Sequence, residues 1–425
     1  MPLPRYPKYK DSGVDWLGEM PAHWAVLKFR HCFYESPEKI ENEIVGSMLS
    51  VSGYRGIEIK EYDDENRRRT DEDLIGYRIV RRGQLVVNTM WLNYAGLGVS
   101  AYEGHVSPAY RSYEIDPRLS KQYAHHLMRS DTYVKGYTKF LTGIRPNSLQ
   151  MGRDDLLSFP VLVPPIEDQD AIAAFLDRET TKIDALIAEQ EKLIALLKEK
   201  RQALISHAVT KGLDPNAPMK DSGIEWLGQV PAHWEVLPVW LLFELGRGRV
   251  ISHEEIAAHE GPFPVYSSQT ENDGEMGRID TYDFDGTYLT WTTDGANAGT
   301  VFRRSGRFNC TNVCGTLKAK SSGIDLGYMV CALGASTSAF VRLDINPKLM
   351  NKVMARIRVP VPPHLEQQEI SALIAERTSG LNKLMQEATR AIELLKERRA
   401  VLISAAVTGK IDVRGLMPAN TRTAE

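Results

Sequence analysis

The stretch of sequence that decides the fold occurs twice in the chain. Lys10 to Leu27 reads KDSGVDWLGEMPAHWAVL, and Lys220 to Leu237 reads KDSGIEWLGQVPAHWEVL, so 13 of 18 positions are identical at an offset of 210 residues. A long internal repeat constrains the architecture before any single residue does, because each copy is expected to form the same local structure. We therefore expect a chain that contains an internal duplication.

A second repeat follows at a different offset. Val163-Pro164-Pro165 recurs as Val361-Pro362-Pro363, and the 15 residues from Leu196 match those from Leu394 at 11 positions, both at an offset of 198. Because the two offsets differ by 12, the intervening segments, about 28 to 160 and 238 to 359, differ in length by about that number. These segments show little resemblance to each other. The chain is thus two copies of a constant block, a variable domain and a constant helix.

The constant helices have the pattern of a coiled coil. The run from about Asp168 to His207 contains no Gly or Pro, and leucine or isoleucine recurs at seven-residue spacing except at Gln190, which aligns with Ala388 of the second helix. About 40 residues give a helix of roughly 60 Å. We expect Leu186 and Leu193 to form a second row of the seam. The predicted seam residues of both helices are Leu176, Ile183, Leu197, Leu204, Ile374, Leu381, Leu395 and Leu402.

The two helices are expected to pack against each other. A lone helix of this length would leave a long apolar stripe in water, so an antiparallel pair with pseudo-two-fold symmetry is the simplest arrangement. The alternative is that each helix packs separately on its own domain. The variable segments contain short runs of β-branched and aromatic residues bounded by Gly, Asn and Asp, which indicates β-rich domains. A strand is predicted at Tyr110 to Ile115 and a helix at Lys121 to Ser130.

Composition narrows the function classes. The chain has 425 residues with 52 basic and 55 acidic side chains, a net charge of −3, which argues against indiscriminate binding of polyanions. The N-terminus lacks the apolar stretch of a secretory signal, and no apolar run approaches the roughly 20 residues of a membrane span. We therefore expect a cytoplasmic protein without membrane contact. Because Cys32, Cys310, Cys314 and Cys331 are too sparse for a disulfide framework, reduced thiols are favoured over a zinc site at Cys310 and Cys314.

Each variable domain has a basic C-terminal half. Arg111 to Arg153 contains eight basic and three acidic residues, and Gly295 to Arg358 contains ten basic and two acidic residues. Such halves can form phosphate-facing surfaces, although a solvated face is the alternative. Polar and aromatic residues in Gly-rich loops, together with basic residues of the second domain, are the predicted DNA-binding residues: Tyr54, Arg55, Asn88, Trp91, Asn93, Tyr94, Arg145, Asn147, Ser148, Arg247, Ser267, Ser268, Gln269, Asp294, Asn297, Arg303, Arg304, Thr311 and Asn312.

The motifs of several enzyme classes are missing from the sequence. It contains no phosphate-binding loop of nucleoside triphosphatases, no dinucleotide fingerprint and no [DN]-P-P-[YF] loop of amino-methyltransferases. Glu58-Ile59-Lys60 has the E-x-K spacing of some nucleases, but the second domain has no copy. His23 and His233 are surrounded by Trp, Leu, Gly and Pro, so we interpret both as structural. We predict no catalytic residue and no metal site.

The combination of these features resembles the specificity subunit of type I restriction-modification enzymes. W-L-G-x-x-P-x-H-W precedes each variable domain, and V-P-P-x-x-E-Q precedes the second helix; the first copy has Asp168-Gln169 in place of Glu-Gln. Leu289-Thr-Trp-Thr-Thr-Asp-Gly and Gly83-Gln-Leu-Val-Val-Asn-Thr-Met-Trp also carry the resemblance, which covers nearly the whole chain.

The resemblance implies a non-catalytic DNA-binding subunit that acts in defence against foreign DNA. Each variable domain would read one half of a bipartite double-stranded DNA target, and the helices would set the gap and dock two methyltransferase subunits. S-adenosylmethionine for adenine methylation, and ATP and Mg²⁺ for restriction, would be used by those subunits and by restriction subunits bound through them. On the residues alone, a self-sufficient enzyme and a coiled-coil adaptor for proteins stay open as alternatives.

The predicted fold class is α+β, with two β-rich target-recognition domains joined by two long antiparallel helices. The boundaries run along the chain as an N-terminal constant block (1–27), target-recognition domain 1 (28–160), constant helix 1 (161–210), a linker with the repeated block (211–237), target-recognition domain 2 (238–359), constant helix 2 (360–410) and a flexible tail (411–425).

Overall fold

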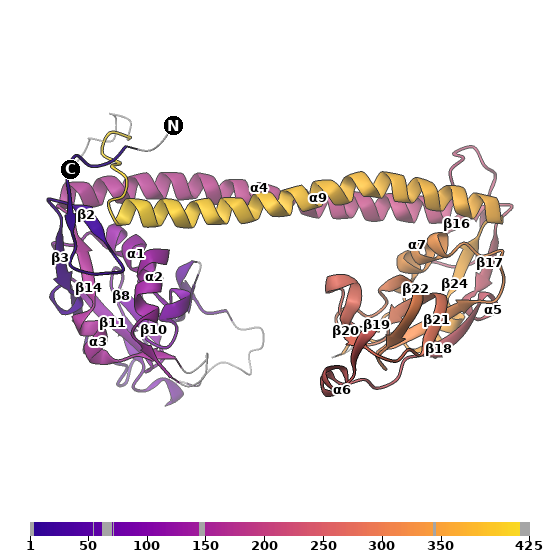
Figure 1. Ribbon diagram of the computed structural model, residues 1–425, viewed down its shortest axis with the longest axis horizontal. Coiled ribbons are helices and arrows are strands. Elements are labelled where there is room, and N and C mark those ends of the chain that lie inside the picture. The colour runs from indigo at the N-terminus through magenta and orange to yellow at the C-terminus, as the bar shows by residue number, and fades with distance from the viewer. Residues whose placement is uncertain are drawn as a thin grey trace. The chain divides into compact units, whose positions relative to one another are not determined.

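The chain folds into two compact units, each carrying one variable domain (Figure 1). The computed structural model describes residues 4–53, 55–61, 70, 72–143, 149–342 and 346–416. Unit 1 comprises Met1–Gln190 and Arg390–Glu425, and unit 2 comprises Glu191–Thr389. Each unit therefore contains part of both long helices. Two β-rich regions joined by two long helices are the α+β architecture that the sequence predicts.

The long helices are α4 (Ile166–Lys211) and α9 (His364–Val407). In unit 1 the first part of α4 packs against the last part of α9, in a core that includes Leu176 and Ile403. In unit 2 the last part of α4 packs against the first part of α9, in a core that includes Ile205 and Ile370. The two helices therefore pair in antiparallel orientation, as predicted.

Of the two predicted seam rows, one is covered in the structure and the other is exposed. Leu176, Ile183, Leu197 and Ile374 are buried, and Leu204, Leu381, Leu395 and Leu402 are half-buried. Leu186 and Leu193, the predicted second row, are 52% and 41% exposed. The row four residues after the first is covered instead: Thr180, Ile187, Thr378 and Ile392 are buried. Positions three and four residues from a seam residue lie on either side of it, and the partner helix covers the latter side.

The variable domain of unit 1 is built on two four-stranded sheets. Their strand orders are β6-β5-β10-β7 and β4-β11-β8-β9, and only the β5–β10 pair is parallel. The predicted strand and helix are confirmed as β11 and α1. The bounds are β4 (Phe33–Glu35), β5 (Ser47–Ser52), β6 (Gly56–Ile59), β7 (Arg78–Val80), β8 (Leu85–Asn88), β9 (Leu97–Val99), β10 (Gly104–Val106), β11 (Tyr110–Ile115), α1 (Lys121–Arg129), α2 (Asp131–Thr138), β12 (Leu141–Thr142), β13 (Gln150–Met151) and α3 (Arg153–Ser158).

The variable domain of unit 2 is built on one six-stranded sheet of order β18-β23-β21-β22-β19-β20. Its β19–β22 pair is parallel, and the other pairs are antiparallel. The bounds are α5 (Val239–Leu242), β18 (Phe243–Arg247), α6 (His253–Ala258), β19 (Glu260–Tyr266), β20 (Glu275–Ile279), β21 (Phe284–Thr292), β22 (Val301–Cys310), β23 (Cys314–Ala319), α7 (Leu326–Thr337) and α8 (Asn351–Arg356).

The constant blocks form the same small structure in both units. Each block contributes an antiparallel hairpin, and its last strand pairs with the strand that leads into the long helix. The bounds are β1 (Tyr9–Asp11), β2 (Glu19–Pro21), β3 (Ala25–Lys28) and β14 (Pro160–Val163) in unit 1, and β15 (Met219–Asp221), β16 (Gln229–Pro231), β17 (Glu235–Pro238) and β24 (Arg358–Val361) in unit 2. The variable domain is thereby inserted between two paired constant strands.

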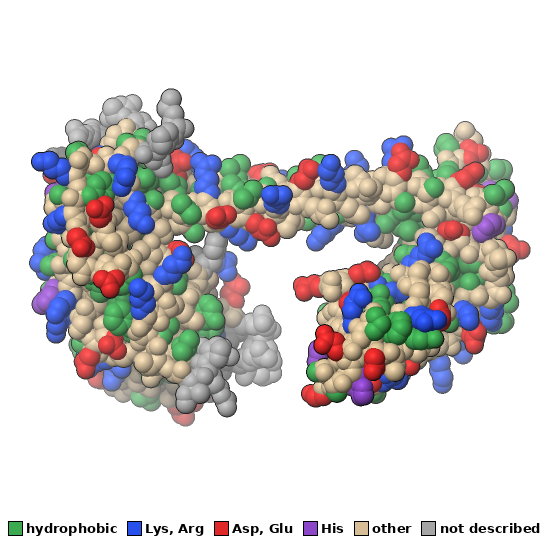
Figure 2. Space-filling view, viewed as in Figure 1, with side chains coloured by type: hydrophobic (Ala, Val, Ile, Leu, Met, Phe, Trp, Pro, Cys, Tyr) green, Lys and Arg blue, Asp and Glu red, His purple; other side chains and the backbone are tan. Residues whose placement is uncertain are grey.

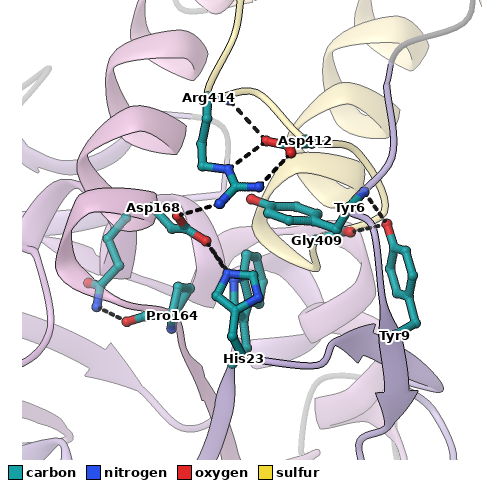
Figure 3. A network of polar contacts seen from close by, with 10 residues as sticks. Tyr6, Tyr9, His23, Pro164, Asp168, Gly409, Asp412 and Arg414 are labelled. Atoms are coloured by element: carbon teal, nitrogen blue, oxygen red, sulfur yellow. Dashed lines mark hydrogen bonds and ion pairs between the residues drawn. The ribbon is translucent and has the colours of Figure 1, made fainter.

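A carboxylate at the start of each long helix holds the constant block. In unit 1, Asp168 Oδ2 lies 2.8 Å from His23 Nε2 and accepts a hydrogen bond from Trp24 Nε1 at 2.9 Å (Figure 3). In unit 2, Glu366 makes the equivalent contacts with His233 at 2.8 Å and Trp234 at 3.1 Å. Both histidines therefore have structural roles, as the sequence analysis predicts.

The glutamine that follows each carboxylate connects the helix to the variable domain. Gln169 donates to the carbonyls of Pro164 and Arg118, and its Oε1 accepts from the backbone N–H of Ser120, the N-cap of α1. Gln367 repeats this set in unit 2, donating to Pro362 and Gly323 and accepting from Asp325, the N-cap of α7. Both side chains are fully buried, so two unlike domains are mounted on one repeated frame.

The first and last described segments of the chain meet in unit 1. The N–H of Asp412 donates to the carbonyl of Pro4 at 2.8 Å, and the Tyr9 hydroxyl donates to the carbonyl of Gly409 (Figure 3). Val413 is fully buried in the core of the unit. The sequence predicts a flexible tail from residue 411, whereas in the structure residues 411–416 pack on unit 1 through the buried Val413. Residues 417–425 lie outside the described part of the chain.

Candidate nucleic-acid interface

An exposed aromatic pair marks the candidate surface of unit 1. Residues 89–96, here called the aromatic loop, connect β8 to β9 and contain the 3₁₀ turn Leu92–Tyr94. Trp91 and Tyr94 are 54% and 56% exposed, and their rings meet edge to face at 5.9 Å. Large aromatic side chains at such exposure are available to contact a partner rather than the core. Asn93 in the same loop is half-buried.

A second segment of unit 1 lies against the aromatic loop. A Cβ at Gly53 would lie 2.5 Å from the carbonyl oxygen of Tyr94, so the two backbones are in direct contact. Arg55 is exposed beside this contact, where it pairs with Glu58 at 2.7 Å. The structure thus brings Arg55, Trp91 and Tyr94 to one region. Tyr54, Arg145, Asn147 and Ser148 lie outside the described residues.

Seven predicted residues of unit 2 are joined by four pairwise polar contacts. Arg247 Nε donates to the carbonyl of Asn312 at 2.7 Å, and its Nη2 lies 3.9 Å from Asp294 Oδ2. The hydroxyls of Thr311 and Ser267 are 3.3 Å apart, and Asn297 Nδ2 donates to the carbonyl of Ser268 at 3.4 Å. We call this set the polar ring: Arg247, Ser267, Ser268, Asp294, Asn297, Thr311 and Asn312.

The polar ring is assembled from separate segments of the chain. They are the end of β18, the β19–β20 connection, the loop after β21 and the turn between β22 and β23. Gln269 follows Ser268 and is exposed, as is Asn312. Hydroxyl, amide and guanidinium groups collected in this way can donate to and accept from base edges. The sequence analysis predicts these residues one by one, but it is the order of the strands in the sheet that brings them together.

Three of the predicted DNA-binding residues are buried and serve the fold instead. Asn88 is 4% exposed, and its Oδ1 accepts from the N–H of Met90 at the start of the aromatic loop. Thr311 is 4% exposed within the polar ring, and Arg304 is 3% exposed. A base contact requires an accessible side chain, and these three are covered within their own unit, so we leave them out of the proposed reading surfaces. Arg303, the neighbour of Arg304 on β22, is exposed.

Many of the basic residues counted in the sequence are paired with acids. Arg78, Arg111 and Arg153 all contact Glu35, at 3.3, 3.1 and 2.9 Å. One carboxylate neutralises one of these three cations, which leaves a local excess of positive charge. On the face drawn in Figure 2, basic and acidic side chains alternate on each unit rather than forming one continuous patch.

The cysteines and the E-x-K segment do not form a metal centre in the described part of the chain. Cys310 and Cys314 are buried beside Phe308 in a small apolar cluster. Among the described residues there is no group of three or more His, Cys, Asp or Glu placed to hold a metal ion. In the same part of the chain, none of the helices combines the length and hydropathy of a membrane span.

Sequence reasoning missed the partners of the repeated histidines. The signal was present: Asp168 and Glu366 are equivalent at the 198-residue offset, and His23 and His233 at the 210-residue offset. Two repeats that recur together at fixed positions are expected to contact each other in each copy. The structure shows that contact as the carboxylate anchor described above.

Comparison with known proteins places these observations in a family. Residues 231–394 match the type I restriction modification DNA specificity domain. A Mycoplasma pneumoniae protein described as a type I specificity subunit, S.MpnORF615P, is 35% identical over 236 residues, which are 55% of this chain and 87% of that protein. The MpnII specificity subunit of the same organism is 40% identical over 166 residues, 39% of this chain and 50% of that one.

The fold agrees with this assignment. A chain from a structural study of complex assembly and conformational transition in a type I R-M system superposes with a TM-score of 0.68, covering 91% of this chain and 98% of that one at 12% identity. At this identity the likeness shows a shared fold. Together with the sequence relatives, it identifies the chain as a member of the family of type I restriction-modification specificity subunits, the non-catalytic components of these enzymes that select DNA.

Proposed function

We propose that this chain reads a bipartite duplex target, with one half-site read by each unit. The observation that carries the proposal is the repeated frame. The anchors at Asp168 and Glu366, and the buried glutamines after them, mount two variable domains in the same way although the domains differ in sequence and sheet order. A repeated frame that carries two different variable domains is suited to a target with two unlike halves.

The aromatic loop and Arg55 in unit 1, and the members of the polar ring other than the buried Thr311 in unit 2, are the surfaces proposed to contact DNA. Tyr54, Arg145, Asn147 and Ser148 are further proposed contacts in unit 1, and Gln269 and Arg303 in unit 2. Arg111 and Arg153 share the carboxylate of Glu35 with Arg78, so this cluster carries a net positive charge that can face phosphate. In this account phosphate contacts position the duplex, while side chains in the loops select bases.

The exposed leucines of the long helices are the proposed docking positions for two methyltransferase subunits. Leu186 and Leu384 are equivalent at the 198-residue offset, and they are 52% and 48% exposed. Leu196 and Leu394 are likewise equivalent, at 53% and 56%. Leucines exposed at equivalent positions in both copies fit a partner that binds twice.

The chemistry in this proposal belongs to those partners. The methyltransferase subunits would methylate adenine with S-adenosylmethionine, and restriction subunits bound through them would use ATP and Mg²⁺ to cut DNA. The helix pair would set the gap between the half-sites. A cytoplasmic location, where such DNA is met, stays part of the proposal.

The test is selection from random-sequence duplexes by the complex reconstituted with its methyltransferase subunits. The expected result is enrichment of a split sequence with two different halves. Replacing residues 28–160 with the equivalent segment of a relative is expected to change one half only. A continuous target, or a change in both halves after the exchange, would refute the proposal.

A further inference from the structure

One half-buried arginine holds both candidate reading segments of unit 1. Arg129 ends α1, and its guanidinium donates to the carbonyls of Ser52 at 3.3 Å and Gly53 at 2.9 Å in one segment. The same group donates to the carbonyls of Ala95 at 3.2 Å and Leu97 at 2.6 Å at the end of the aromatic loop. A single side chain therefore fixes the backbone of two segments relative to each other.

The backbone at Ala95 has an unfavourable conformation that requires stabilising contacts. Ala95 has a φ of 54°, a left-handed conformation that costs a residue with a Cβ about 1 kcal/mol or more. Its carbonyl points to Arg129 in this conformation. Tyr94, the exposed aromatic residue proposed to contact DNA, immediately precedes it. A change at Arg129 is thus expected to move Tyr94 without touching it.

His125 completes the contact from the preceding turn of α1. Its Nδ1 accepts from the N–H of Val99 at 3.2 Å, next to the segment held by Arg129. Burial, together with the charge of Arg129, lowers the pKa of His125 to about 3, so the ring is neutral at physiological pH and can accept this bond. Burial also lowers the pKa of Arg129 to about 10, which leaves it charged.

In unit 2 a different arginine, on a strand rather than a helix, holds a loop in the same way. Arg304 lies on β22, where its guanidinium carbon is 3.8 Å from the centre of the Tyr266 ring and 4.4 Å from that of Phe302. Its Nη1 donates to Asp273 Oδ2 at 2.6 Å, and its Nη2 donates to the carbonyl of Asp273 at 2.5 Å. The arginine side chain is 2% exposed, whereas that of Asp273 is 76% exposed.

The segment that Arg304 holds carries part of the polar ring. Residues 267–275 begin with Ser267 and Ser268, and the N–H of Ser267 donates to the carbonyl of Gly274 to close the loop. Asn272 and Asp273 have φ values of 48° and 54°, so this loop also contains left-handed backbone. Arg304 therefore anchors a strained loop to the sheet.

We propose that Arg129 and Arg304 are positioning residues for base selection, each acting on the reading loops of its own unit. This inference rests on the proposed function. The guanidinium is suited to the role because its planar fork binds several acceptors at fixed angles, whereas a lysine ammonium is a flexible point charge. The two arginines lie on unlike elements, α1 and β22, in domains without sequence resemblance, so the shared contact is not part of the repeated frame.

The experiment compares methylated sites selected by complexes that carry Arg129→Lys, Arg304→Lys or Asp273→Asn. Arg118→Lys is the matched control, because Arg118 is an exposed arginine of unit 1 whose guanidinium bonds Asp116 and the carbonyl of His31. For each complex, the adenines methylated on a random-sequence library are mapped, and the thermal stability and salt-dependent binding to unrelated duplex are measured.

The expected result for Arg129→Lys is a fall of about tenfold in discrimination at one or more positions of one half-site. The other half-site, the gap and binding to unrelated duplex stay unchanged. Arg304→Lys and Asp273→Asn relax the opposite half-site, and Arg118→Lys changes neither. Asp273→Asn tests the same contact in unit 2 even if Arg304→Lys fails to fold, since Asp273 is exposed.

Two results would overturn the inference. One is lower stability with an unchanged methylated sequence in both halves, which shows a purely structural role for the arginines. The other is relaxation of both halves by a single variant, which contradicts action within one unit. Failure of the proposed function is distinct, because the wild-type complex would then select no split sequence.

Discussion

The carboxylate anchor makes a quantitative prediction about stability. Asp168 is 4% exposed and its Oδ2 faces both His23 and Trp24, while its Oδ1 lies 3.7 Å from Arg414 Nη1 (Figure 3). Asp168→Asn keeps the shape and one acceptor but removes the charge. Charge-assisted hydrogen bonds are about twice as strong as neutral ones, so the expected loss is ~1–2 kcal/mol in the free energy of unfolding.

Asp168→Ala is expected to cost more. It leaves the indole N–H of the buried Trp24 without its acceptor, a penalty of about 1–3 kcal/mol, and it also removes the contact with the half-exposed His23. The expected total is ~2–4 kcal/mol. In unit 2, Glu366→Gln is expected to cost less than Asp168→Asn, because the Glu366 side chain is 24% exposed and that of Asp168 is 5% exposed.

The assay is urea unfolding of the purified chain, followed by tryptophan fluorescence and fitted for each unit. Asp170→Asn is the matched control, because Asp170 is an exposed carboxylate in the same turn of α4. It removes the same charge near the helix N-terminus without touching the anchor. Equal effects of Asp168→Asn and Asp170→Asn would refute the reasoning, since the loss would then come from the helix charge alone.

Three further predictions concern pH, partner docking and the aromatic loop. His125 has a folded pKa of about 3 against a usual value of 6.5, so unfolding takes up a proton between these pH values and stability falls as pH falls below about 6.5. His125→Gln is expected to reduce that slope by up to ~1.4 kcal/mol per pH unit in urea unfolding between pH 6 and 4, and an unchanged slope would count against a neutral, half-buried ring. Leu196→Glu and Leu394→Glu are each expected to weaken one methyltransferase subunit about tenfold, and the double variant both, as measured by native mass spectrometry; full occupancy in the double variant would exclude these positions from docking. Trp91→Ala is expected to cost ~1–3 kcal/mol in DNA binding with little change in stability, because the side chain is 54% exposed; unaltered affinity in a gel shift would remove the aromatic loop from the interface.

The sequence predicts the repeated frame of constant blocks and long helices well, because each of its parts occurs twice in the chain. The repeats at offsets of 210 and 198 residues give the constant blocks, the long helices and their antiparallel pairing. The error in the seam has a simple cause. Leu186 and Leu193 lie three residues after Ile183 and Gln190, so they suggest a second seam row. The residue type alone does not show which side of the first row the partner helix covers.

The candidate surfaces could be predicted only in part. Loop composition named Trp91, Tyr94 and the members of the polar ring, but it did not separate them from Asn88 and Arg304, which have the same residue types and are buried. Burial depends on which strands are neighbours, and the parallel β19–β22 pair is a long-range contact without a local signal. Arg129 was counted as one charge of a basic run, because its carbonyl partners are 32 to 77 residues away along the chain.

The central proposal is that the helix pair of one duplicated frame sets the gap between two unlike half-sites, and a matched insertion tests it most directly. Seven residues are added to α4 after Gln190 and seven to α9 after Ala388, which preserves the heptad and lengthens the pair by about 10 Å, or about 3 base pairs. Mapping of methylated adenines is expected to show the same two half-sites with a gap wider by about 3 base pairs. An unchanged gap, or altered half-sites with the original gap, would contradict the account.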